Sequence, residues 1–544
     1  MDLKTEKPDN LSKSHFIIGT RGSLLALAQC TLIKEELEKN TNATFELQIV
    51  KTQGDQVQDK PLWQMEGKDF FTKELDEKLL NKQVDIVVHS YKDLGSQRPI
   101  GITLGAITER KFAHDILIMS EAGLKKLQNS GKILIGTSSP RRMFQLEENL
   151  KSFLPYTSSR INLQIESLRG NVNSRLEKLQ NQHFDGIVLA LAGLERLCAH
   201  ESSNRKILEL LKKTHFKILP LSIFPSAPGQ GALAIEYLND KSDHSRKIQR
   251  ILSTVNDLAT TTETTLEKKY FQKYGGGCHL AIGINVQTIY PHPSQLIHIN
   301  GKIDSLRIKE NFHQPILEKK INPTELFIGL SDDHQVSFYK NKNILFDSLF
   351  TKKILPLDQV AQNLKNKEWL FLASKNCHHL LNHTGRHQLI WVSGAKSQEI
   401  ISQQSLCWVS GDNDSLGETQ FLKFQNSDFW KIWHKANFDQ EQLPIFVCTG
   451  EKSSVTIPLA HKISCYDIIR TPPNEKFLKE LQKRSFFYWT SPNQFEHYNP
   501  FLPKNAFHFC GPGKTFNYIS HFTKNIAMIP RMSDFKNLIN DLNQ

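Results

Sequence analysis

Three short polar motifs in the first 240 residues each follow directly on an apolar run. They are TRGS (20–23), HSYKD (89–93) and GTSSPRR (136–142). Hydroxyls, backbone amides and cationic side chains meet there, at strand ends and helix starts. A helix N-terminus favours anions, and a guanidinium can bind a carboxylate or phosphate through two parallel hydrogen bonds. The motifs therefore predict an anion-binding site.

Basic residues recur at equivalent positions, at strand ends and helix starts. Any one of them could be a plain surface charge, but so many indicate a ligand with more negative charge than one phosphate carries. The set is Arg21, Lys68, Lys92, Arg141, Arg142, Arg169, Arg175 and Arg196.

Asp93 is the acidic residue among these cations, directly after Lys92. Two roles stay open for its carboxylate. It could be a structural counter-ion, or it could stabilise a cation that develops in a substrate and help to move protons.

The elements that must position these residues alternate along the first 235 residues. We expect strands at 16–20, 45–52, 85–90 and 186–193, and in the runs DILIM, KILIGTSS and NLQIESL; we expect helices at 24–39, 70–82, 140–150 and 172–182, the first capped by Ser23. This alternation predicts an α/β fold with mostly parallel sheets, which bind ligands at the carboxyl ends of their strands.

The texture changes beyond residue 257. A helix at 257–273 leads into GGGC (275–278) and two strand-like runs, which predicts a small α+β unit. Residues 322–366 have no clear pattern. Strand–helix alternation returns from 368, where LFLASKNCHHLL and FYWTSPNQFEHY suggest two related α/β halves.

Composition excludes several classes of protein. The chain has 544 residues, 39% hydrophobic and 23% charged, which predicts several domains. There is no apolar run of membrane-spanning length and the N-terminus lacks an apolar signal core, so we expect a cytoplasmic protein. The eight cysteines contain no CxxC pair, which argues against zinc and disulfides. The charge of +12 could attract nucleic acid, but no finger, KH or RRM signature accompanies it.

Eight motifs, taken together and in order, carry a resemblance over about 14–321. They are IGTRGSLLALAQ, GDQVQDKPLWQMEGKDFFTKELDEKLL, DIVVHSYKDL, GTSSPRR, SLRGNVNSRLEKL, FDGIVLALAGLERL, PGQGALAIE and GGGCHLAIG. In these the chain resembles the hydroxymethylbilane synthase (porphobilinogen deaminase) family. Over about 366–544 it resembles uroporphyrinogen-III synthase, through LFLASKNC, QLIWVSGAKSQEII, FVCTGEKSSVTIPLAHKI, YDIIRT, FYWTSPNQF, FHFCGPGKTFNYI and MIPRMSDFKNLINDL.

The first resemblance implies an activity and a cofactor. The family condenses four porphobilinogen molecules into linear hydroxymethylbilane and releases four ammonia molecules. Its dipyrromethane cofactor would be attached through a thioether to Cys278. Loss of ammonia creates an electron-poor azafulvene cation, which the carboxylate matching Asp93 stabilises. No metal and no diffusible cofactor are implied.

The resemblance also assigns roles residue by residue. Catalytic positions match Asp93 and Lys92. Cofactor-binding positions match Cys278, Arg21, Ser23, Ser90, Lys92, Thr137, Ser138, Arg141, Arg142, Arg169 and Gln230. Substrate-binding positions match Arg21, Lys68, Phe71, Arg169, Arg175 and Arg196. The chain departs from the family pattern at Leu24, Asp69, Gly95 and Glu263, which bears on lid behaviour and rate.

The second resemblance implies closure of hydroxymethylbilane into a macrocycle with inversion of the last ring. Thr490, Ser491, Gly511 and Thr515 match loop positions of that family's cleft. The family's usual tyrosine falls near Ile469, and its opening strand and helix are not recognisable in 322–366. Three readings stay open: a bifunctional enzyme, a hydroxymethylbilane synthase with a degenerate structural tail, and, more remotely, a non-catalytic anion-binding protein.

These inferences predict a five-domain monomer. Two domains resembling periplasmic binding proteins form a hinged cleft, at 14–108 with 232–253 and at 112–226. A cofactor-carrying domain follows at 257–321. Residues 322–366 form a linker or the degenerate first part of the synthase region, and synthase-like domains follow at 367–465 and 466–544. The expected partners are porphobilinogen and hydroxymethylbilane, without nucleic acid or membrane.

Overall fold

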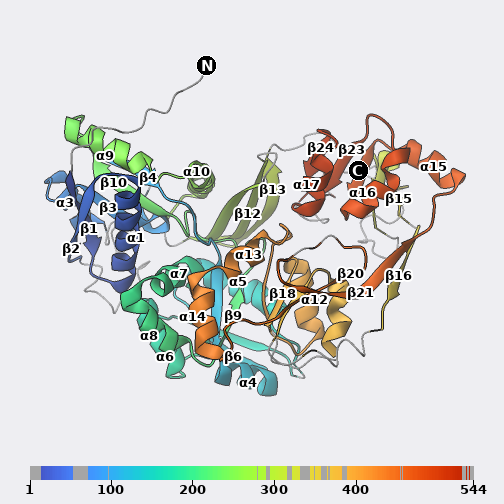
Figure 1. Ribbon diagram of the computed structural model, residues 1–544, viewed down its shortest axis with the longest axis horizontal. Helices are drawn as coiled ribbons and strands as arrows, with labels where there is room; N and C mark the ends of the chain where they lie inside the picture. Colours follow the sequence, from blue (N-terminus) through green and yellow to red (C-terminus); the bar gives the residue numbers. More distant parts are fainter. Residues whose placement is uncertain are drawn as a thin grey trace.

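The protein is a mixed α/β chain with several sheets (Figure 1). The computed structural model describes residues 14–52, 72–95, 97–157, 159–277, 280–289, 294–314, 321–330, 343–347, 349–356, 364, 368–382, 389–453, 455, 457–529, 535 and 538. Among these residues, no helix combines the length and the apolar character needed to cross a membrane.

The first sheet has the strand order β2-β1-β3-β10-β4. Its strands are β1 (His15–Arg21), β2 (Thr44–Val50), β3 (Ile86–Ser90), β4 (Ile102–Ile107) and β10 (Leu233–Leu238); its helices are α1 (Leu24–Asn40), α3 (Lys73–Leu80) and α9 (Asp243–Ser253). Ser23 caps α1 as expected, because its hydroxyl accepts a hydrogen bond from the Ala26 amide at 3.3 Å.

The second sheet has the order β7-β6-β8-β5-β9. Its strands are β5 (Asp115–Ser120), β6 (Lys132–Gly136), β7 (Asn162–Glu166), β8 (Gly186–Ala190) and β9 (Thr214–Ile218); its helices are α4 (Glu121–Ser130), α5 (Pro140–Asn149), η3 (Leu150–Phe153), α6 (Val172–Gln180), α7 (Leu191–Ala199) and α8 (Glu201–Leu211). The expected strand at 186–193 was too long. It ends at Ala190, because Leu191, Leu194 and Leu197 recur at helical spacing and bury one face of α7.

One strand in each of these sheets runs against the other four. It is β10 in the first sheet and β5 in the second, each antiparallel to both neighbours. These are the strands that the chain enters directly from the other sheet. Residues 108–114, the first crossover segment, join β4 to β5, and residues 219–232, the second crossover segment, join β9 to β10. The sheets are therefore mostly parallel, with an exception where the chain changes sheet.

A small α+β unit follows. Asp257 caps α10 (Leu258–Lys273) by accepting the Thr260 amide at 2.7 Å. Strands β11 (Ala281–Ile289), β12 (Ser294–Ile303) and β13 (Leu306–Gln314) then form an antiparallel sheet.

Two further sheets complete the chain, in the orders β16-β21-β20-β17-β18-β19 and β15-β14-β22-β23-β24. Their strands are β14 (Leu326–Ile328), β15 (Leu345–Phe346), β16 (Phe350–Ile354), β17 (Trp369–Leu372), β18 (Leu389–Val392), β19 (Val409–Asp412), β20 (Ile445–Gly450), β21 (His461–Arg470), β22 (Phe486–Trp489), β23 (Phe507–Cys510) and β24 (Ile526–Met528). Their helices are η4 (Pro323–Glu325), η7 (Lys375–Asn382), α12 (Ala395–Gln404), α13 (Thr419–Gln425), α14 (Asp428–Asn437), α15 (Glu475–Gln482), α16 (Pro492–Tyr498), η8 (Asn499–Phe501) and α17 (Lys514–Ser520).

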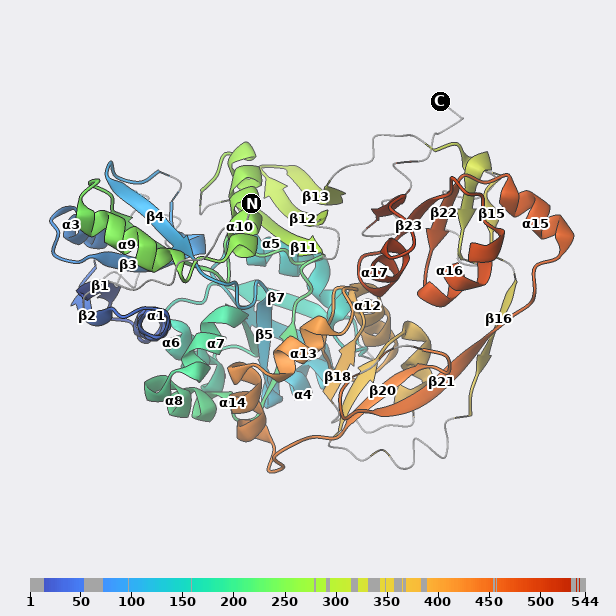
Figure 2. The ribbon, with the colours of Figure 1, turned by 45° about the horizontal axis from the view of Figure 1, so that its top comes forward.

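Residues 322–366 do more than link two regions. They supply β14 and β15 to the last sheet and β16 to the six-stranded sheet. Their strands are short, which explains why the sequence pattern did not reveal them. Strand β21 also continues to Arg470, past the expected domain boundary at 465/466, and leads toward the last sheet (Figure 2).

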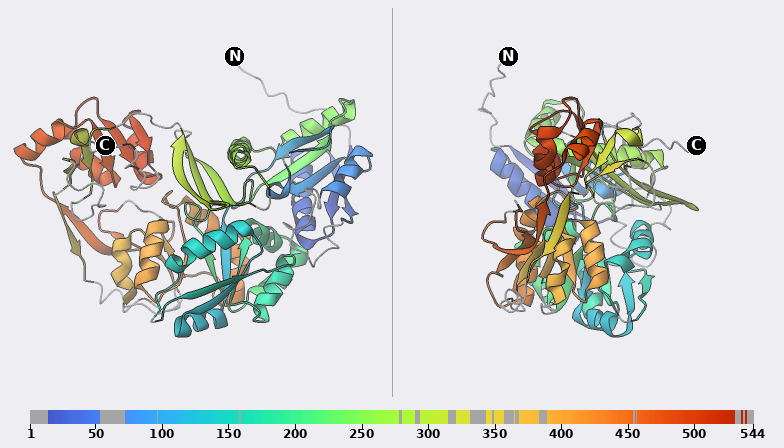
Figure 3. Two further views of the ribbon diagram at one scale, coloured as in Figure 1. Left: turned by 180° about the vertical axis from the view of Figure 1, so that it is seen from behind. Right: turned by 90° about the vertical axis from the view of Figure 1, so that its right-hand side faces the viewer.

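The second sheet and the six-stranded sheet lie side by side along the base of the molecule (Figures 1 and 3). The first sheet rises above one end and the last sheet above the other. One apolar core runs through the base: Phe216 of β9 packs edge-on against Trp433 of α14, with ring centroids 4.7 Å apart. Trp408 donates its indole N–H to the Phe216 carbonyl at 2.6 Å. The two halves of the chain are therefore packed together through a buried interface.

Candidate functional site

The carboxyl end of β3 continues into the short helix η2 (Tyr91–Asp93). Tyr91 is buried, and the Lys268 ammonium lies 4.2 Å from its ring centre. Gln29 of α1 donates to the Ser90 hydroxyl at 2.9 Å, which ties the helix after β1 to the end of β3. The turn is thus anchored while the side chain of Asp93 stays exposed and that of Lys92 half-buried.

The start of α5 carries two buried arginines that share one carboxylate. Arg141 Nη1 lies 2.8 Å from one oxygen of Asp115, and Arg142 Nη2 lies 2.7 Å from the other. Burial alone would raise the pKa of Asp115, but the two guanidinium charges outweigh it and hold that pKa well below its usual range. One carboxylate against two cations leaves a net positive charge at this helix start.

Sequence reasoning did not single out Asp115. The available signal was an aspartate at the first position of the apolar run DILIM, directly after the first crossover segment. A buried carboxylate in such a run needs cationic partners.

Several of the expected ligand-binding side chains also hold the fold together. Arg141 donates to the Pro225 carbonyl at 3.0 Å, and Arg142 to the Val188 carbonyl at 3.2 Å. Gln230 donates to the Ala113 carbonyl at 2.6 Å and so links the two crossover segments. Among the described residues, Arg142 Nε has no hydrogen-bond partner, so part of this guanidinium is still available to a ligand.

Arg169 and Arg175 extend the positive charge beside Arg142. Burial lowers the pKa of Arg175 to about 10, and the charges of Arg142 and Arg169 contribute to this shift. Arg169 Nη1 is buried and has no hydrogen-bond partner among the described residues. Uncompensated buried charge is costly, so three neighbouring guanidinium groups favour a polyanionic ligand.

Hydroxyl groups shape the loops around this cluster. Ser138 donates to the Leu168 carbonyl at 2.6 Å and thereby positions the residue before Arg169. Thr137 is fully buried, and its hydroxyl accepts the Ser139 amide at 3.4 Å. Ser139 in turn caps α5 by accepting the Arg142 amide.

Lys92 shows that the strand ends of the two sheets face each other. Burial lowers the pKa of Lys92; the charge of Asp93 opposes this shift, and the charges of Arg142 and Arg141 add to it. The arginines belong to the second sheet and Lys92 to the first, so the structure brings the predicted cations of both sheets to one place.

Arg196 and the remaining expected residues differ in their surroundings. Burial lowers the pKa of Arg196 to about 10, and its Nη2 donates to the Gly231 carbonyl at 2.7 Å. Arg21 and Ser23 lie at the end of β1, half-buried. Cys278, Lys68 and Phe71 lie outside the described residues, as does Asp69.

The glycines before Cys278 have a backbone that only glycine adopts readily. Gly275, Gly276 and Gly277 have φ angles of 96°, 60° and 122°. An added Cβ at Gly275 or Gly276 would meet nothing within 4 Å, so the conformation, and not the space, requires glycine there. Glu263, one of the departures from the family pattern, ties α10 to β11 by accepting the Thr288 amide at 2.8 Å.

A second buried polar group lies in the first sheet. Asp76, His89 and Glu236 come close enough to hold a metal ion. Arg98 already lies between the two carboxylates, 2.5 Å from Asp76 Oδ1 and 2.7 Å from Glu236 Oε1. This guanidinium neutralises the acidic groups, and the cluster acts as a buried ion-pair network.

The expected C-terminal site lies at the carboxyl ends of β22 and β23, which are parallel neighbours. Ser491 caps α16 by accepting the Gln494 amide at 3.3 Å, and Thr490 donates to the Gly329 carbonyl at 3.3 Å. Gly511 follows β23, and Thr515 lies in the first turn of α17. The structure brings these four residues to one sheet edge.

Few charged side chains accompany this edge. Lys514 pairs with Glu418 of the six-stranded-sheet region at 2.6 Å. Arg470 is neutralised by Asp347 at 2.7 Å, and Tyr498 donates to the same carboxylate at 2.7 Å. In the part of the chain that the structure describes, this edge offers hydroxyls and backbone amides where the first site offers arginines.

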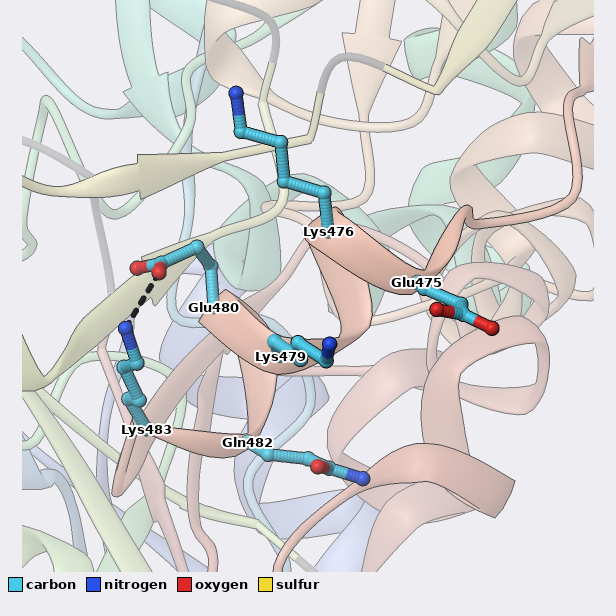
Figure 4. A pocket seen from close by; sticks show the side chains of 6 residues that line it. All are labelled: Glu475, Lys476, Lys479, Glu480, Gln482 and Lys483. Carbon is cyan, nitrogen blue, oxygen red and sulfur yellow. Dashed lines mark hydrogen bonds and ion pairs between the residues drawn. The ribbon is translucent and has the colours of Figure 1, made fainter.

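An open hollow of about 720 Å³ lies on helix α15, lined by Glu475, Lys476, Lys479, Glu480, Gln482 and Lys483 (Figure 4). Its walls come from helix α15 and the residue after it, and Lys483 pairs with Glu480 at 2.6 Å. It shares no residue with either strand-end site and has no features of a binding site.

Comparisons with known proteins agree on the first half of the chain. A family model described as "Porphobilinogen deaminase, dipyromethane cofactor binding domain" matches residues 16–246. Porphobilinogen deaminase of Campylobacter hominis is 40% identical over 271 residues, 50% of this chain and 79% of the relative. Porphobilinogen deaminase of Lachnospira eligens is 36% identical over 297 residues, 54% of this chain and 92% of the relative.

A uroporphyrinogen-III synthetase is among the solved structures with some similarity to this chain. The uroporphyrinogen-III synthetase of Helicobacter pylori 26695 is 9% identical and covers 39% of this chain and 97% of its own, with a TM-score of 0.26. A score of this size does not establish a shared fold.

Proposed function

The chain belongs to the porphobilinogen deaminase family, and on this premise we propose that residues 14–321 condense porphobilinogen into hydroxymethylbilane at the facing strand ends of the first two sheets. The observation that carries the proposal is a cluster of neighbouring cations at the facing strand ends. The charges of Arg142 and Arg169 act on Arg175, and those of Arg142 and Arg141 act on Lys92. Among the described residues, Asp115 supplies only part of the negative charge that this cluster needs. A chain of pyrroles that gains two carboxylates with each ring would supply that charge.

The family domain binds a dipyrromethane cofactor, and the residues present fit such a group. The unpartnered Nη1 of Arg169 and Nε of Arg142 are donors that cofactor carboxylates would satisfy. Thr137 and Ser138 hold the loops that carry these arginines, and Cys278 would provide the covalent attachment. The cofactor supplies the pyrrole chain from which the product grows.

Asp93 and Lys92 would act on the reacting ring. Asp93 ends η2 with an exposed carboxylate, within reach of a ligand held by the arginines of the second sheet. A carboxylate there would stabilise a cation developing on the incoming pyrrole and accept or return a proton. Desolvation lowers the pKa of Lys92, which makes its ammonium a better proton donor beside Asp93.

We propose further that the C-terminal region closes hydroxymethylbilane into uroporphyrinogen III at the edge formed by Thr490, Ser491, Gly511 and Thr515. Convergent hydroxyls and helix starts at one sheet edge support this role. The second candidate is a structural tail, which the shared core between Phe216 and Trp433 supports. The domain limits, the monomeric state and the cytoplasmic location expected from the sequence stay predictions.

One assay separates these possibilities. Purified full-length protein is incubated with porphobilinogen, and the products are oxidised in acid and separated by chromatography. Mainly uroporphyrin III means that both halves are active. Mainly uroporphyrin I means that the first half is active and the second is not, because free hydroxymethylbilane closes without inversion. No porphyrin, with no dipyrromethane adduct in the intact mass, would contradict the proposal for the first half.

A further inference from the structure

The first two sheets can move relative to each other only by bending the crossover segments, 108–114 and 219–232. The second sheet, residues 115–218, has no other covalent connection to the rest of the chain. Groups that contact both crossover segments therefore influence the distance between the strand ends of the two sheets.

A loop from the C-terminal half contacts both crossover segments through one buried carboxylate. This junction loop, residues 412–418, begins at the last residue of β19. Asp414 accepts the Leu221 amide at 2.8 Å and the Ser222 hydroxyl at 2.8 Å, both in the second crossover segment. His114 Nε2, in the first crossover segment, lies 3.6 Å from the same carboxylate.

The electrostatics of Asp414 agree with a charged contact. Burial alone would raise the pKa of this carboxyl, but the neighbouring His114 imidazole and the Ser222 hydroxyl hold that pKa below its usual range. The side chain is only 1% exposed. Its contacts are therefore screened little by solvent.

Helix α13, just beyond the loop, adds two contacts to the first crossover segment. Gln420 Nε2 lies 2.8 Å from His114 Nε2, and Lys423 donates to the Arg110 carbonyl at 3.2 Å. The Lys423 ammonium also lies 5.4 Å from the centre of the Phe112 ring.

Hydrogen bonds and an ion pair hold the junction loop in place along its length. Asp412 accepts the Asp414 amide at 2.6 Å, and Asn413 accepts the Trp391 indole N–H at 2.8 Å. Asp414 and Ser415 keep φ angles of 46° and 65°, a conformation that persists only where neighbours enforce it. At the far end of the loop, Glu418 pairs with Lys514 of the last sheet's region.

The α+β unit also contacts both crossover segments through one buried carboxylate, that of Glu267. This carboxylate accepts two hydrogen bonds from Arg110, at 2.9 and 2.8 Å, and one from the Gly229 amide at 2.7 Å. The crossover segments thus lie between a buried carboxylate of the deaminase half and a buried carboxylate of the C-terminal half.

We propose that Asp414 is a positioning residue for pyrrole condensation, through which the C-terminal half sets the hinge of the first two sheets. The proposal rests on the proposed condensation activity and is independent of any cyclase activity. Each added ring needs room between the two sheets, and that room depends on the hinge. A loosened hinge would slow the later additions more than the first.

The test compares full-length variants that are mixed with a few equivalents of porphobilinogen and followed by intact mass. In Asp414→Asn, an amide NH2 group replaces one of the two accepting oxygens. It then faces a backbone N–H of the second crossover segment, so that hydrogen bond is lost. We expect the later additions to slow about threefold to tenfold, while the first addition changes less than about twofold. Ser222→Ala removes a partner of the same carboxylate and should shift the adducts in the same direction, with an effect that is not additive with Asp414→Asn.

Glu195→Gln is the matched control. Glu195 is a buried carboxylate at the same interface, where it accepts the Asp428 and Phe429 amides at 3.0 and 2.8 Å. The charge of Lys111 in the first crossover segment acts on it, but among the described residues no hydrogen bond joins Glu195 to either crossover segment. It should leave the adduct distribution unchanged. The proposal is overturned if Asp414→Asn and Ser222→Ala elongate like the wild type, or if Glu195→Gln slows the later additions equally. An Asp414→Asn protein that does not fold leaves the decision to Ser222→Ala. Absence of any adduct in the wild type would instead refute the condensation activity itself.

Discussion

The two strand-end sites of this chain use different chemistry at similar places. Both lie where parallel strands end and helices begin. In the first, Arg142, Arg169 and Arg175 crowd together with partial compensation from Asp115. In the second, Arg470 is neutralised by Asp347, and the edge presents the hydroxyls of Thr490 and Ser491.

The difference concerns how much charge each site leaves uncompensated. A surplus of buried cations lowers stability unless an anion binds, so the first site requires a polyanion for its own stability. The second site is satisfied without a ligand. A ligand there would be recognised mainly by shape and by hydrogen bonds, a requirement that many sequences can meet and that leaves a weaker pattern.

The largest expected effect is on chemistry at the first site alone. Asp93→Asn should lower the rate of porphobilinogen consumption about 100-fold to 1000-fold, because the amide cannot stabilise a developing cation or take a proton. The dipyrromethane on Cys278 should still be present in the intact mass. Asp439→Asn, an exposed aspartate in the C-terminal half, is the control. Full turnover in Asp93→Asn would remove this residue from the mechanism.

A smaller effect is expected from removing one arginine of the cluster. Arg169→Gln or Arg175→Gln should lower kcat/KM for porphobilinogen about 10-fold to 100-fold, since each removes a charge-assisted hydrogen bond to a carboxylate. Steady-state kinetics measures this, and the ratio of uroporphyrin isomers should not change. Arg205→Gln, on the exposed face of α8, should match the wild type. If the cluster variants matched that control, the charge surplus would have no role in binding.

The converse variant acts at the second site. Thr490→Val keeps the shape but removes the hydroxyl that contacts Gly329 and Gln494. If the C-terminal region is active, the ratio of uroporphyrin III to I should fall about threefold to tenfold while total porphyrin is unchanged. Thr523→Val, beyond the opposite end of α17, should leave the ratio as it is. A fall in total porphyrin together with an unchanged ratio would contradict the separation of the two sites.

The smallest expected effect concerns the interface between the halves. Lys217 of β9 is fully buried, donates to the Val409 carbonyl and lies 4.7 Å from the centre of the Trp408 ring. Burial lowers its pKa to about 7, against the opposing charge of Asp412. The pKa of lysine in the unfolded chain is about 10.4. The free-energy cost of burying the charge is therefore fully present below pH 7 and disappears as the pH rises toward 10.

Lys217→Met isolates that contribution. Between pH 7 and 10 the wild type should gain stability relative to Lys217→Met, by at most about 1.4 kcal/mol per pH unit. Thermal unfolding of both proteins across this range measures the difference. A constant difference between them would mean that Lys217 stays protonated in the folded protein.

Much of the first half could be predicted because its signals are local. Ser23 caps the helix that the sequence pattern placed after it, and strands such as β3 and β6 are apolar runs that end in polar motifs. The C-terminal sheets were harder. Strands β14 and β15 have three and two residues, too few for a periodic pattern. Strand β15 pairs with β14, and β14 pairs with β22, which lies more than a hundred positions away.

The sequence by itself determined which side chains stand at strand ends and helix starts, because hydrophobic period and capping act over a few residues. From this followed the predictions of an α/β class, of a set of ligand-facing arginines and of an anionic ligand. Tertiary structure alone decided how those charges are compensated: that Asp115 serves two arginines, that Arg98 occupies the acidic cluster, and that Asp414 reaches the hinge from 192 residues away. Coulomb interactions and buried hydrogen bonds depend on distance in space, and a sequence pattern contains that distance only for near neighbours.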